Sequence, residues 1–117
     1  VAGTFEAVDR TEFLASLEKY YGHPAQSALG GKERVGSAML VSGGAYKMLS
    51  EAAKAGIDCF ITGNFDEPAW HDAFELGVNF YALGHSATER VGPKALGNYI
   101  RDEWHVEVAF LDLYNPF

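Results

Sequence analysis

The chain of 117 residues is 48% apolar and 21% charged, which is enough for the core of one domain and argues against disorder. Its 16 acidic and 9 basic side chains give a net charge of −7, which argues against nucleic acid as the main partner because phosphate binding needs a basic patch. No apolar run approaches the about 20 residues that cross a bilayer, and the first residues carry no signal-peptide pattern. The single cysteine, Cys59, rules out an internal disulfide and is compatible with a reducing compartment. We therefore expect one cytoplasmic domain over residues 1–117, with no membrane and no nucleic-acid partner.

The first predicted helix begins near Asp9 or Thr11, either of which can cap it, and its apolar residues keep helical spacing as far as Tyr21. Gly22 is a natural end for this helix. Residues 23–32 hold two adjacent glycines and a proline, which predicts irregular or edge structure.

From residue 33 onward, strands and helices are predicted to alternate. Apolar periodicity and glycine stops predict strands over 35–41, 59–62, 79–83 and 106–111, and helices over 45–55, 67–76 and within 86–104. Gly92-Pro93 predicts a kink or a restart in the last helix, because proline lacks an N–H donor and its ring crowds the preceding turn. The alternation implies an α/β fold around a mostly parallel or mixed sheet, with right-handed crossovers.

Polar side chains gather where the predicted strands end. Ligands of open α/β sheets bind at the carboxyl ends of the strands. Three strand-to-helix junctions, at 42–44, 62–67 and 84–86, would share that edge. The polar residues at or just beyond these junctions are Ser42, Asn64, Asp66, Glu67, His85, Ser86 and Glu89. We expect the functional site at this edge of the sheet.

Two histidine and glutamate pairs at four-residue spacing adjoin this edge, His85 with Glu89 and Glu67 with His71. Residues i and i+4 lie on one face of a helix, so an imidazole nitrogen and a carboxylate oxygen could hold one metal ion together. The same spacing is common between exposed residues on helix surfaces. Each pair on its own therefore also fits an ordinary solvent-exposed contact.

Two other features are interpreted without a ligand. Gly43-Gly44 fits a tight turn better than a phosphate-binding loop, because the glycine spacings of the known phosphate loops are missing. Cys59 lies in an apolar segment with no activating base nearby in the sequence, so we interpret it as a buried core residue rather than a nucleophile.

Three short sequence words give the chain a family resemblance. They are I-T-G-x-x-x-E-x-x-x-H over 61–71, G-H-x-A-T-E-R-x-G-x-x-A-L-G over 84–97, and a closing D-x-x-N-P over 112–116. Together they resemble the dinuclear-metal-centre, GTP cyclohydrolase 1 type 2-like family, also called the NGG-one-interacting factor three-like proteins. The G-H-x-A-T-E-R word is the most specific, and the resemblance runs from about Thr4 to the C-terminus.

The resemblance implies an α/β protein of two similar halves that assembles as a toroidal hexamer, with two metal ions per full site held by ligands from both halves. It implies that His85 and Glu89 are metal ligands. It places Glu67, His71 and Asn64 close to the site, where they would line it or support the ligands, and it assigns no catalytic residue. The ions would be divalent, and histidine with carboxylate suits zinc, iron and manganese.

The chain departs from the family pattern in two ways. It matches only the C-terminal half, so the His-His pair and the aspartate of the first half have no counterpart, and two ligands cannot close a dinuclear site. We expect either a piece of a longer protein, which the start at Val1 favours, or a half-length member that borrows ligands or has lost the metal. Asn64 stands where the family usually has glutamate, and an amide is a poorer metal ligand and no general base.

We expect the chain to form part of a metal-dependent hydrolase that acts on a nucleotide or another phosphate-containing small molecule. Metal-bound water would be the nucleophile. The alternative is a non-enzymatic scaffold or interaction module that keeps the fold and the self-association. Its metal site would be vestigial or incomplete, and Asn64 and the missing half favour this alternative.

Overall fold

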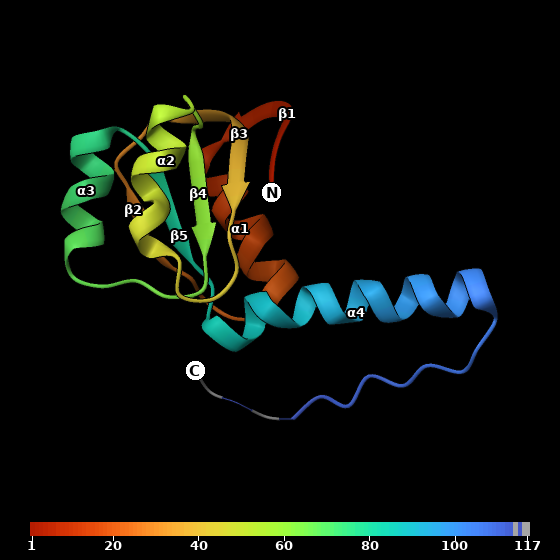
Figure 1. Ribbon diagram of the computed structural model, residues 1–117. Coiled ribbons are helices and arrows are strands. Elements are labelled where there is room, and N and C mark those ends of the chain that lie inside the picture. The colour runs from red at the N-terminus through yellow and green to blue at the C-terminus, as the bar shows by residue number, and fades with distance from the viewer. Residues whose placement is uncertain (114, 116–117) are drawn as a thin grey trace.

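The computed structural model describes residues 1–113 and 115 and arranges them around a mixed five-stranded sheet (Figure 1). The strands are β1 (Ala2–Asp9), β2 (Gln26–Leu29), β3 (Arg34–Leu40), β4 (Cys59–Thr62) and β5 (Asn79–Ala82). Their order is β1-β3-β4-β5-β2, with β3, β4 and β5 pairing in parallel and the two edge strands pairing antiparallel. The predicted α/β fold with a mixed sheet is confirmed.

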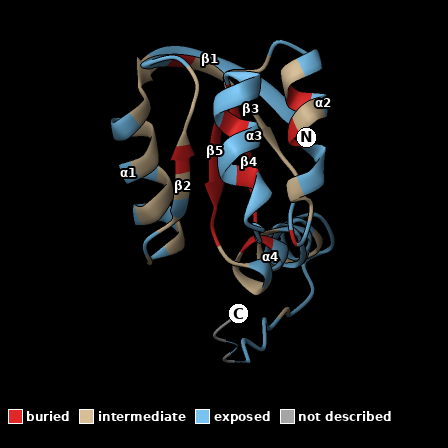
Figure 2. Ribbon diagram, turned by 90° about the vertical axis from the view of Figure 1, so that its left-hand side faces the viewer, coloured by how far each residue is buried: buried red, intermediate tan, exposed pale blue. Residues whose placement is uncertain are grey.

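Helices cover both faces of the sheet. They are α1 (Arg10–Tyr21), the 3-10 turn η1 (Tyr46–Met48), α2 (Leu49–Lys54), α3 (Pro68–Leu76) and α4 (His85–Trp104). Helix α1 packs on one face, and α2 and α3 pack on the other (Figures 1 and 2). None of the described helices combines the length and apolar character needed to span a bilayer.

The two central strands β4 and β5 are buried on both faces, and their side chains alternate between the two helix layers. Phe60 and Phe80 point into the core beneath α2 and α3, with ring centroids 6.1 Å apart. Ile61 and Tyr81 point into the core beneath α1, where Tyr81 meets Phe13 edge-on at 5.8 Å. Such strands are near-continuous apolar runs because neither face meets water.

Most local predictions are confirmed. Helix α1 begins after Asp9, whose Oδ1 accepts a hydrogen bond from the Thr11 N–H (2.7 Å), and it ends at Gly22, whose φ is 78°. Strand β4 occupies the predicted 59–62. Pro93 lies inside α4, which continues to Trp104, so this helix does not restart there.

Two features at the ends of the chain differ from expectation. The strand predicted over 106–111 is wrong, because this segment pairs with no strand in the described part of the chain. Strand β1 was not foreseen. It is an exposed edge strand with weak alternation, and its place depends on antiparallel pairing with β3 far along the sequence. Strand β2 within 23–32 agrees with the expected edge structure.

The amino end of β4 carries a hydrogen-bonded carboxylate. The oxygens of Asp58 accept from the Gly36 N–H (3.0 Å), the Ser37 hydroxyl (3.0 Å) and the Lys32 ammonium (2.9 Å). Burial would raise the pKa of Asp58, but these donors together hold its pKa below the ordinary value. A depressed pKa in the folded state means that the carboxylate stabilises the fold above its unfolded pKa of about 3.9. This stabilisation is lost as the pH falls through the folded pKa.

Asp58→Asn is expected to lower the free energy of unfolding at neutral pH by about 1–3 kcal/mol, because the Gly36 and Ser37 donors lose their charged acceptor. The variant should also lose less stability than the wild type as the pH falls below about 4, because it lacks the carboxylate that is protonated there. Urea unfolding at neutral and acid pH measures both effects. The control is Asp72→Asn on the exposed surface of α3, and an equal loss in both variants would contradict the role given to Asp58.

Candidate functional site

Three loops that follow β3, β4 and β5 meet at the carboxyl edge of the sheet, as the sequence predicted. The Gly43 carbonyl accepts hydrogen bonds from the N–H groups of Gly63 (2.9 Å) and Asn64 (3.1 Å). The Gly84 N–H in turn donates to the Gly63 carbonyl (2.9 Å). Direct backbone contact between neighbouring loops holds the start of α4 against the turn after β3.

This contact requires glycine at two positions. A Cβ on Gly63 would lie 2.7 Å from the His85 Cα and 2.8 Å from the Gly43 carbonyl oxygen, closer than atoms can pack. Gly43 has a φ of 71°, and a Cβ there would lie 2.6 Å from Glu89 Oε1. The glycines thus let the His85 and Glu89 side chains lie directly over the backbone of another loop.

Thr88 fastens the first turn of α4 to this arrangement. The side chain is buried, its hydroxyl oxygen accepts from the Gly43 N–H (3.0 Å), and its hydroxyl donates to the Gly84 carbonyl (2.9 Å). Thr88 was not among the site residues predicted from the sequence. Its signal was present in the A-T-E-R word, between the two proposed ligands.

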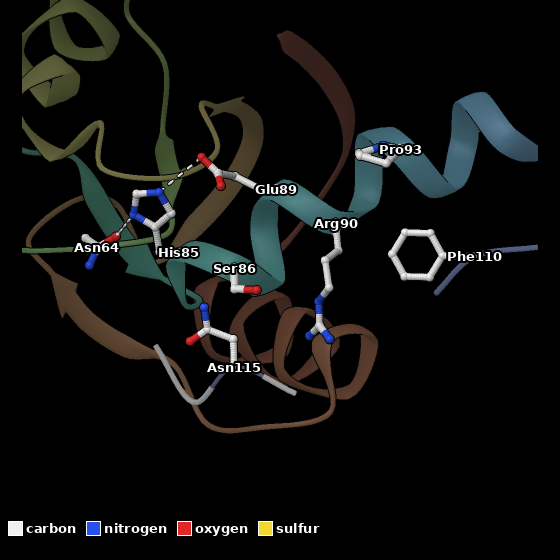
Figure 3. A pocket seen from close by; sticks show the side chains of 8 residues that line it. All are labelled: Asn64, His85, Ser86, Glu89, Arg90, Pro93, Phe110 and Asn115. Atoms are coloured by element: carbon white, nitrogen blue, oxygen red, sulfur yellow. Dashed lines mark hydrogen bonds and ion pairs between the residues drawn. The ribbon is translucent and has the colours of Figure 1, made fainter. Parts of the chain in front are cut away.

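His85 and Glu89 lie together, and Asn64 contacts the far side of the imidazole ring (Figure 3). His85 Nε2 is 3.1 Å from Glu89 Oε1, and His85 Nδ1 is 2.6 Å from Asn64 Oδ1. The side chains of His85 and Glu89 are 46% and 54% exposed, so both are open to a ligand. The i,i+4 spacing and the carboxyl-edge loops therefore bring these three predicted residues into one cluster.

The contact with Asn64 determines which ring nitrogen of a neutral His85 carries the proton. Because the Asn64 carbonyl oxygen can only accept, a neutral His85 carries its proton on Nδ1. Its Nε2 then presents a lone pair to the Glu89 carboxylate, which is also an acceptor. Two acceptors 3.1 Å apart repel each other unless a positive charge lies between them, and either a second proton on the ring or a metal cation supplies it.

The spacing fits a metal cation. Two donor atoms at about 2.1 Å from one ion lie about 3.0 Å apart at a right angle and about 3.4 Å apart at the tetrahedral angle. The observed 3.1 Å falls between these values. Within the described residues, however, no group of three or more histidine, cysteine, aspartate or glutamate side chains is placed to hold a metal. His85 and Glu89 thus have the spacing of two donors to one ion, and a complete coordination shell would need further donors.

A cavity of about 400 Å³ opens beside this cluster. Its walls come from the loop after β4, the first turns of α4 and the returning C-terminal segment (Figure 3). The lining residues are Asn64, His85, Ser86, Glu89, Arg90, Pro93, Phe110 and Asn115.

The second predicted pair lies apart from this cavity. Glu67 lines a different, mainly apolar pocket of about 380 Å³ with Phe65 and Trp70, while His71 is exposed on α3. No ion pair joins Glu67 to His71 among the described residues. The structure therefore places Asn64 beside His85 and leaves Glu67 and His71 outside the cavity.

Cys59 is fully buried, which confirms its interpretation as a core residue. Burial raises the pKa of its thiol to about 12, so the reactive thiolate is scarce at neutral pH.

Residues 1–116 match the protein family described as Duf34/NIF3 (NGG1p interacting factor 3). The chain belongs to the Duf34/NIF3 family. The curated relatives include a GTP cyclohydrolase 1 type 2 homolog of Chlamydia pneumoniae, which is 52% identical over 118 residues that cover 100% of this chain and 47% of the relative. A protein of the same name from Chlamydia muridarum is 54% identical over 118 residues, with the same coverage. This Duf34/NIF3 chain spans about half the length of these relatives.

Solved structures share the fold. The protein ybgI, described as of unknown function, superposes with a TM-score of 0.90 at 34% identity, covering 99% of this chain and 48% of that chain. A protein from Thermus thermophilus superposes with a TM-score of 0.86 at 27% identity, covering 99% of this chain and 46% of its own.

Thr88→Val is expected to lower the free energy of unfolding by about 1–3 kcal/mol, because the shape is kept while the Gly43 N–H is left buried without an acceptor. Thr88→Ser, which keeps the hydroxyl, is the matched control and should lose less. Denaturant unfolding of the two variants beside the wild type measures the difference. Equal stability of the valine and wild-type proteins would show that this hydroxyl does not fasten α4.

Proposed function

We propose that this Duf34/NIF3 chain supplies one side of a divalent-metal centre in a metal-dependent hydrolase, with His85 and Glu89 as ligands. The observation that carries the proposal is the pair of acceptors, His85 Nε2 and Glu89 Oε1, facing each other at 3.1 Å beside an open cavity. The family resemblance of the G-H-x-A-T-E-R word assigns the same two residues independently of this geometry.

Asn64 supports the ligand role of His85. Histidines that bind metals usually donate the proton of the second ring nitrogen to an oxygen, which fixes both the tautomer and the ring orientation. Asn64 Oδ1 receives that proton at 2.6 Å and leaves Nε2 free for the ion. A neutral amide orients the ring in this way, although it does not add the negative charge that a carboxylate would bring.

The full centre needs donors beyond this chain. Two protein ligands do not complete a shell of about four or more donors. The resemblance implies two ions of zinc, iron or manganese held by both halves of a longer protein, and this chain spans about half the length of its curated relatives. The remaining ligands would come from a second unit at the rim of the cavity, and the resemblance further implies a hexameric ring.

The chemistry follows from this arrangement. A divalent ion held there would supply an acidified water molecule for hydrolysis. His85 and Glu89 would hold the ion, Asn64 would keep the imidazole in place, and the cavity of about 400 Å³ would admit a small molecule. The relatives' name, GTP cyclohydrolase 1 type 2 homolog, supports a nucleotide or another phosphate-containing substrate, and a cytoplasmic location accords with such a substrate.

A non-enzymatic scaffold is the second candidate. Two features favour a scaffold. The amide of Asn64 cannot act as a general base, and the two donors His85 and Glu89 do not close a metal site. A scaffold would keep the fold without holding metal, so metal binding separates the two functions.

The 117-residue protein is expected to bind one Zn²⁺ or Mn²⁺ per chain weakly, and His85→Ala and Glu89→Gln should each weaken this binding at least about 10-fold by removing a donor. Isothermal titration with the metal alone measures the affinity. The control is His105→Asn, which removes an imidazole at the distant end of α4, where asparagine tolerates the positive φ of 53°. Equal affinity in the wild type and His85→Ala would contradict the ligand role of His85 and favour the scaffold.

Asn64→Ala is expected to move the proton of neutral His85 from Nδ1 toward Nε2 and to weaken metal binding about 10- to 100-fold. Asn64→Asp keeps an acceptor in place and should retain the Nδ1–H form. Long-range ¹H–¹⁵N NMR of the imidazole ring identifies the tautomer in the metal-free protein. A wild-type ring protonated on Nε2 would show that Asn64 does not orient it.

A further inference from the structure

A polar stripe runs along the side of α4 that faces the returning C-terminal segment. Ser86, Arg90 and Lys94 are spaced four residues apart, so they lie along one side of the helix. His85 and Glu89 each stand one residue earlier, about 100° around the helix axis from this stripe. Figure 3 shows the Arg90 side chain pointing away from Glu89 and toward the returning segment. The cavity therefore has the two proposed metal ligands on one side and Ser86 and Arg90 on the other.

A carboxylate of the chain itself lies between the two cations of this stripe. Asp112 Oδ1 is 2.7 Å from Arg90 Nη1, and Asp112 Oδ2 is 3.7 Å from Lys94 Nζ. Each carboxylate oxygen meets one cation, as in a site where two cations bind one bridging anion. The hydrogen bond from Arg90, together with the charge of Lys94, holds the pKa of Asp112 below its usual range. The pair of cations is thus arranged for an anion and is occupied by an internal one.

Asp112 is held there by a weak contact. The side chains of Arg90, Lys94 and Asp112 are 35%, 48% and 42% exposed, so water screens all three charges. The backbone of residues 106–113 makes no hydrogen bond with any described residue. Side-chain contacts attach this segment to α4, among them the Phe110 ring, whose centre lies 4.8 Å from Lys94 Nζ. Asp112 can therefore leave the two cations without breaking a strand or a helix.

The two cations are matched better by a phosphate group than by one carboxylate. Arg90 and Lys94 carry two positive charges against the single negative charge of Asp112, in a chain whose net charge is −7. A phosphate group carries about 1.5 to 2 negative charges near neutral pH and offers three acceptor oxygens. The planar guanidinium of arginine also binds two phosphate oxygens at once. A phosphate is therefore the anion that best replaces Asp112.

The cavity wall continues from the cations with groups that suit the rest of such a ligand. The Ser86 hydroxyl, one helical turn before Arg90, makes no hydrogen bond with any described residue, so it can donate to an anion beside the guanidinium. Pro93 and Phe110 form an apolar part of the wall. A small molecule that joins a phosphate group to an uncharged body fits this division of the cavity.

We propose that Arg90 and Lys94 bind the phosphate group of the substrate, and that Asp112 occupies this site until the phosphate displaces it. The inference rests on the proposed function, because it takes the cavity beside His85 and Glu89 as the substrate site. Arg90 and Lys94 then select a phosphorylated molecule. Asp112 raises the concentration at which that molecule enters, since it competes for the same two cations.

The test is a titration of the metal-free 117-residue protein with inorganic pyrophosphate, followed by ¹H–¹⁵N NMR. The side-chain signal of Arg90 and the amide signal of Asp112 should shift with one dissociation constant, because the anion replaces the carboxylate. Asp112→Asn should bind pyrophosphate at least about 3-fold more tightly, and Arg90→Gln at least about 10-fold more weakly. A wild-type protein that binds no pyrophosphate, or binds it without a shift at Asp112, would overturn the proposal.

The same helix supplies controls of matched charge. Arg101 pairs with Asp102 at 2.9 Å near the far end of α4. Arg101→Gln and Asp102→Asn change the net charge in the same way as Arg90→Gln and Asp112→Asn, but each should alter the pyrophosphate affinity by less than about 2-fold. Equal effects of Asp112→Asn and Asp102→Asn would mean that only the net charge matters, and the site would be refuted.

A second set of ligands identifies which part of the substrate is bound. Adenosine, which lacks phosphate, should bind at least about 10-fold more weakly than ADP, and Lys94→Gln should weaken the binding of ADP and of pyrophosphate alike. Equal affinities for adenosine and ADP would mean that the cavity recognises the nucleoside, against the role given to Arg90 and Lys94. If Asp112→Asn does not fold, the shift of the Asp112 amide in the wild type and the loss of affinity in Lys94→Gln decide the question.

The metal titrations decide the proposed function separately. Because pyrophosphate binding is measured without metal, its absence would overturn the anion site and leave the metal affinities of the His85 and Glu89 variants as they stand. Pyrophosphate binding by a protein that binds no Zn²⁺ or Mn²⁺ would support the anion site and count against the hydrolase.

Discussion

The direct backbone contact between three loops at the carboxyl edge of the sheet is the constraint on which the rest of this structure depends. The Gly43 carbonyl accepts hydrogen bonds from two N–H groups of the loop after β4, and the Gly43 N–H donates to the hydroxyl oxygen of Thr88. A Cβ at Gly63 would collide with the His85 Cα, and a Cβ at Gly43 would collide with the Glu89 carboxylate, so the loop glycines decide where His85 and Glu89 lie. The core of aromatic and aliphatic residues keeps the strands in place, but it is this contact that turns their ends into a site.

The site itself is an arrangement of hydrogen-bond acceptors. Asn64 Oδ1 accepts a hydrogen bond from Nδ1 of a neutral His85, so Nε2 and the Glu89 carboxylate face each other without a proton between them. Two such acceptors repel each other unless a cation or an added proton lies between them. This need for a positive charge is the reason that the geometry is suited to a metal ion. The same arrangement is open on one side, where a cavity and the returning segment meet.

The incomplete donor set and the exposed segment after α4 are two signs of the same situation. At the site, the two proposed ligands, His85 and Glu89, would leave a coordination shell open, because the described residues place no third histidine, cysteine, aspartate or glutamate beside them. In the fold, several apolar side chains of α4 and of residues 106–113 are exposed, and the backbone of 106–113 has no hydrogen-bond partner among the described residues. Both are consistent with a protein that spans about half the length of its curated relatives, in which the matched segment lies beside further polypeptide.

The sequence by itself determined the features that depend on neighbours along the chain. The capped helix from Arg10 to Tyr21, the buried strand at 59–62 and the i,i+4 spacing of His85 and Glu89 are local, because periodicity and caps act within a few residues. Only the tertiary structure decided which polar residues meet. It placed Asn64 against His85 while leaving Glu67 outside the cavity, since loops of one sheet edge diverge after the strands end. It also left 106–111 without a pairing strand among the described residues, because a strand exists only where another backbone supplies its hydrogen bonds.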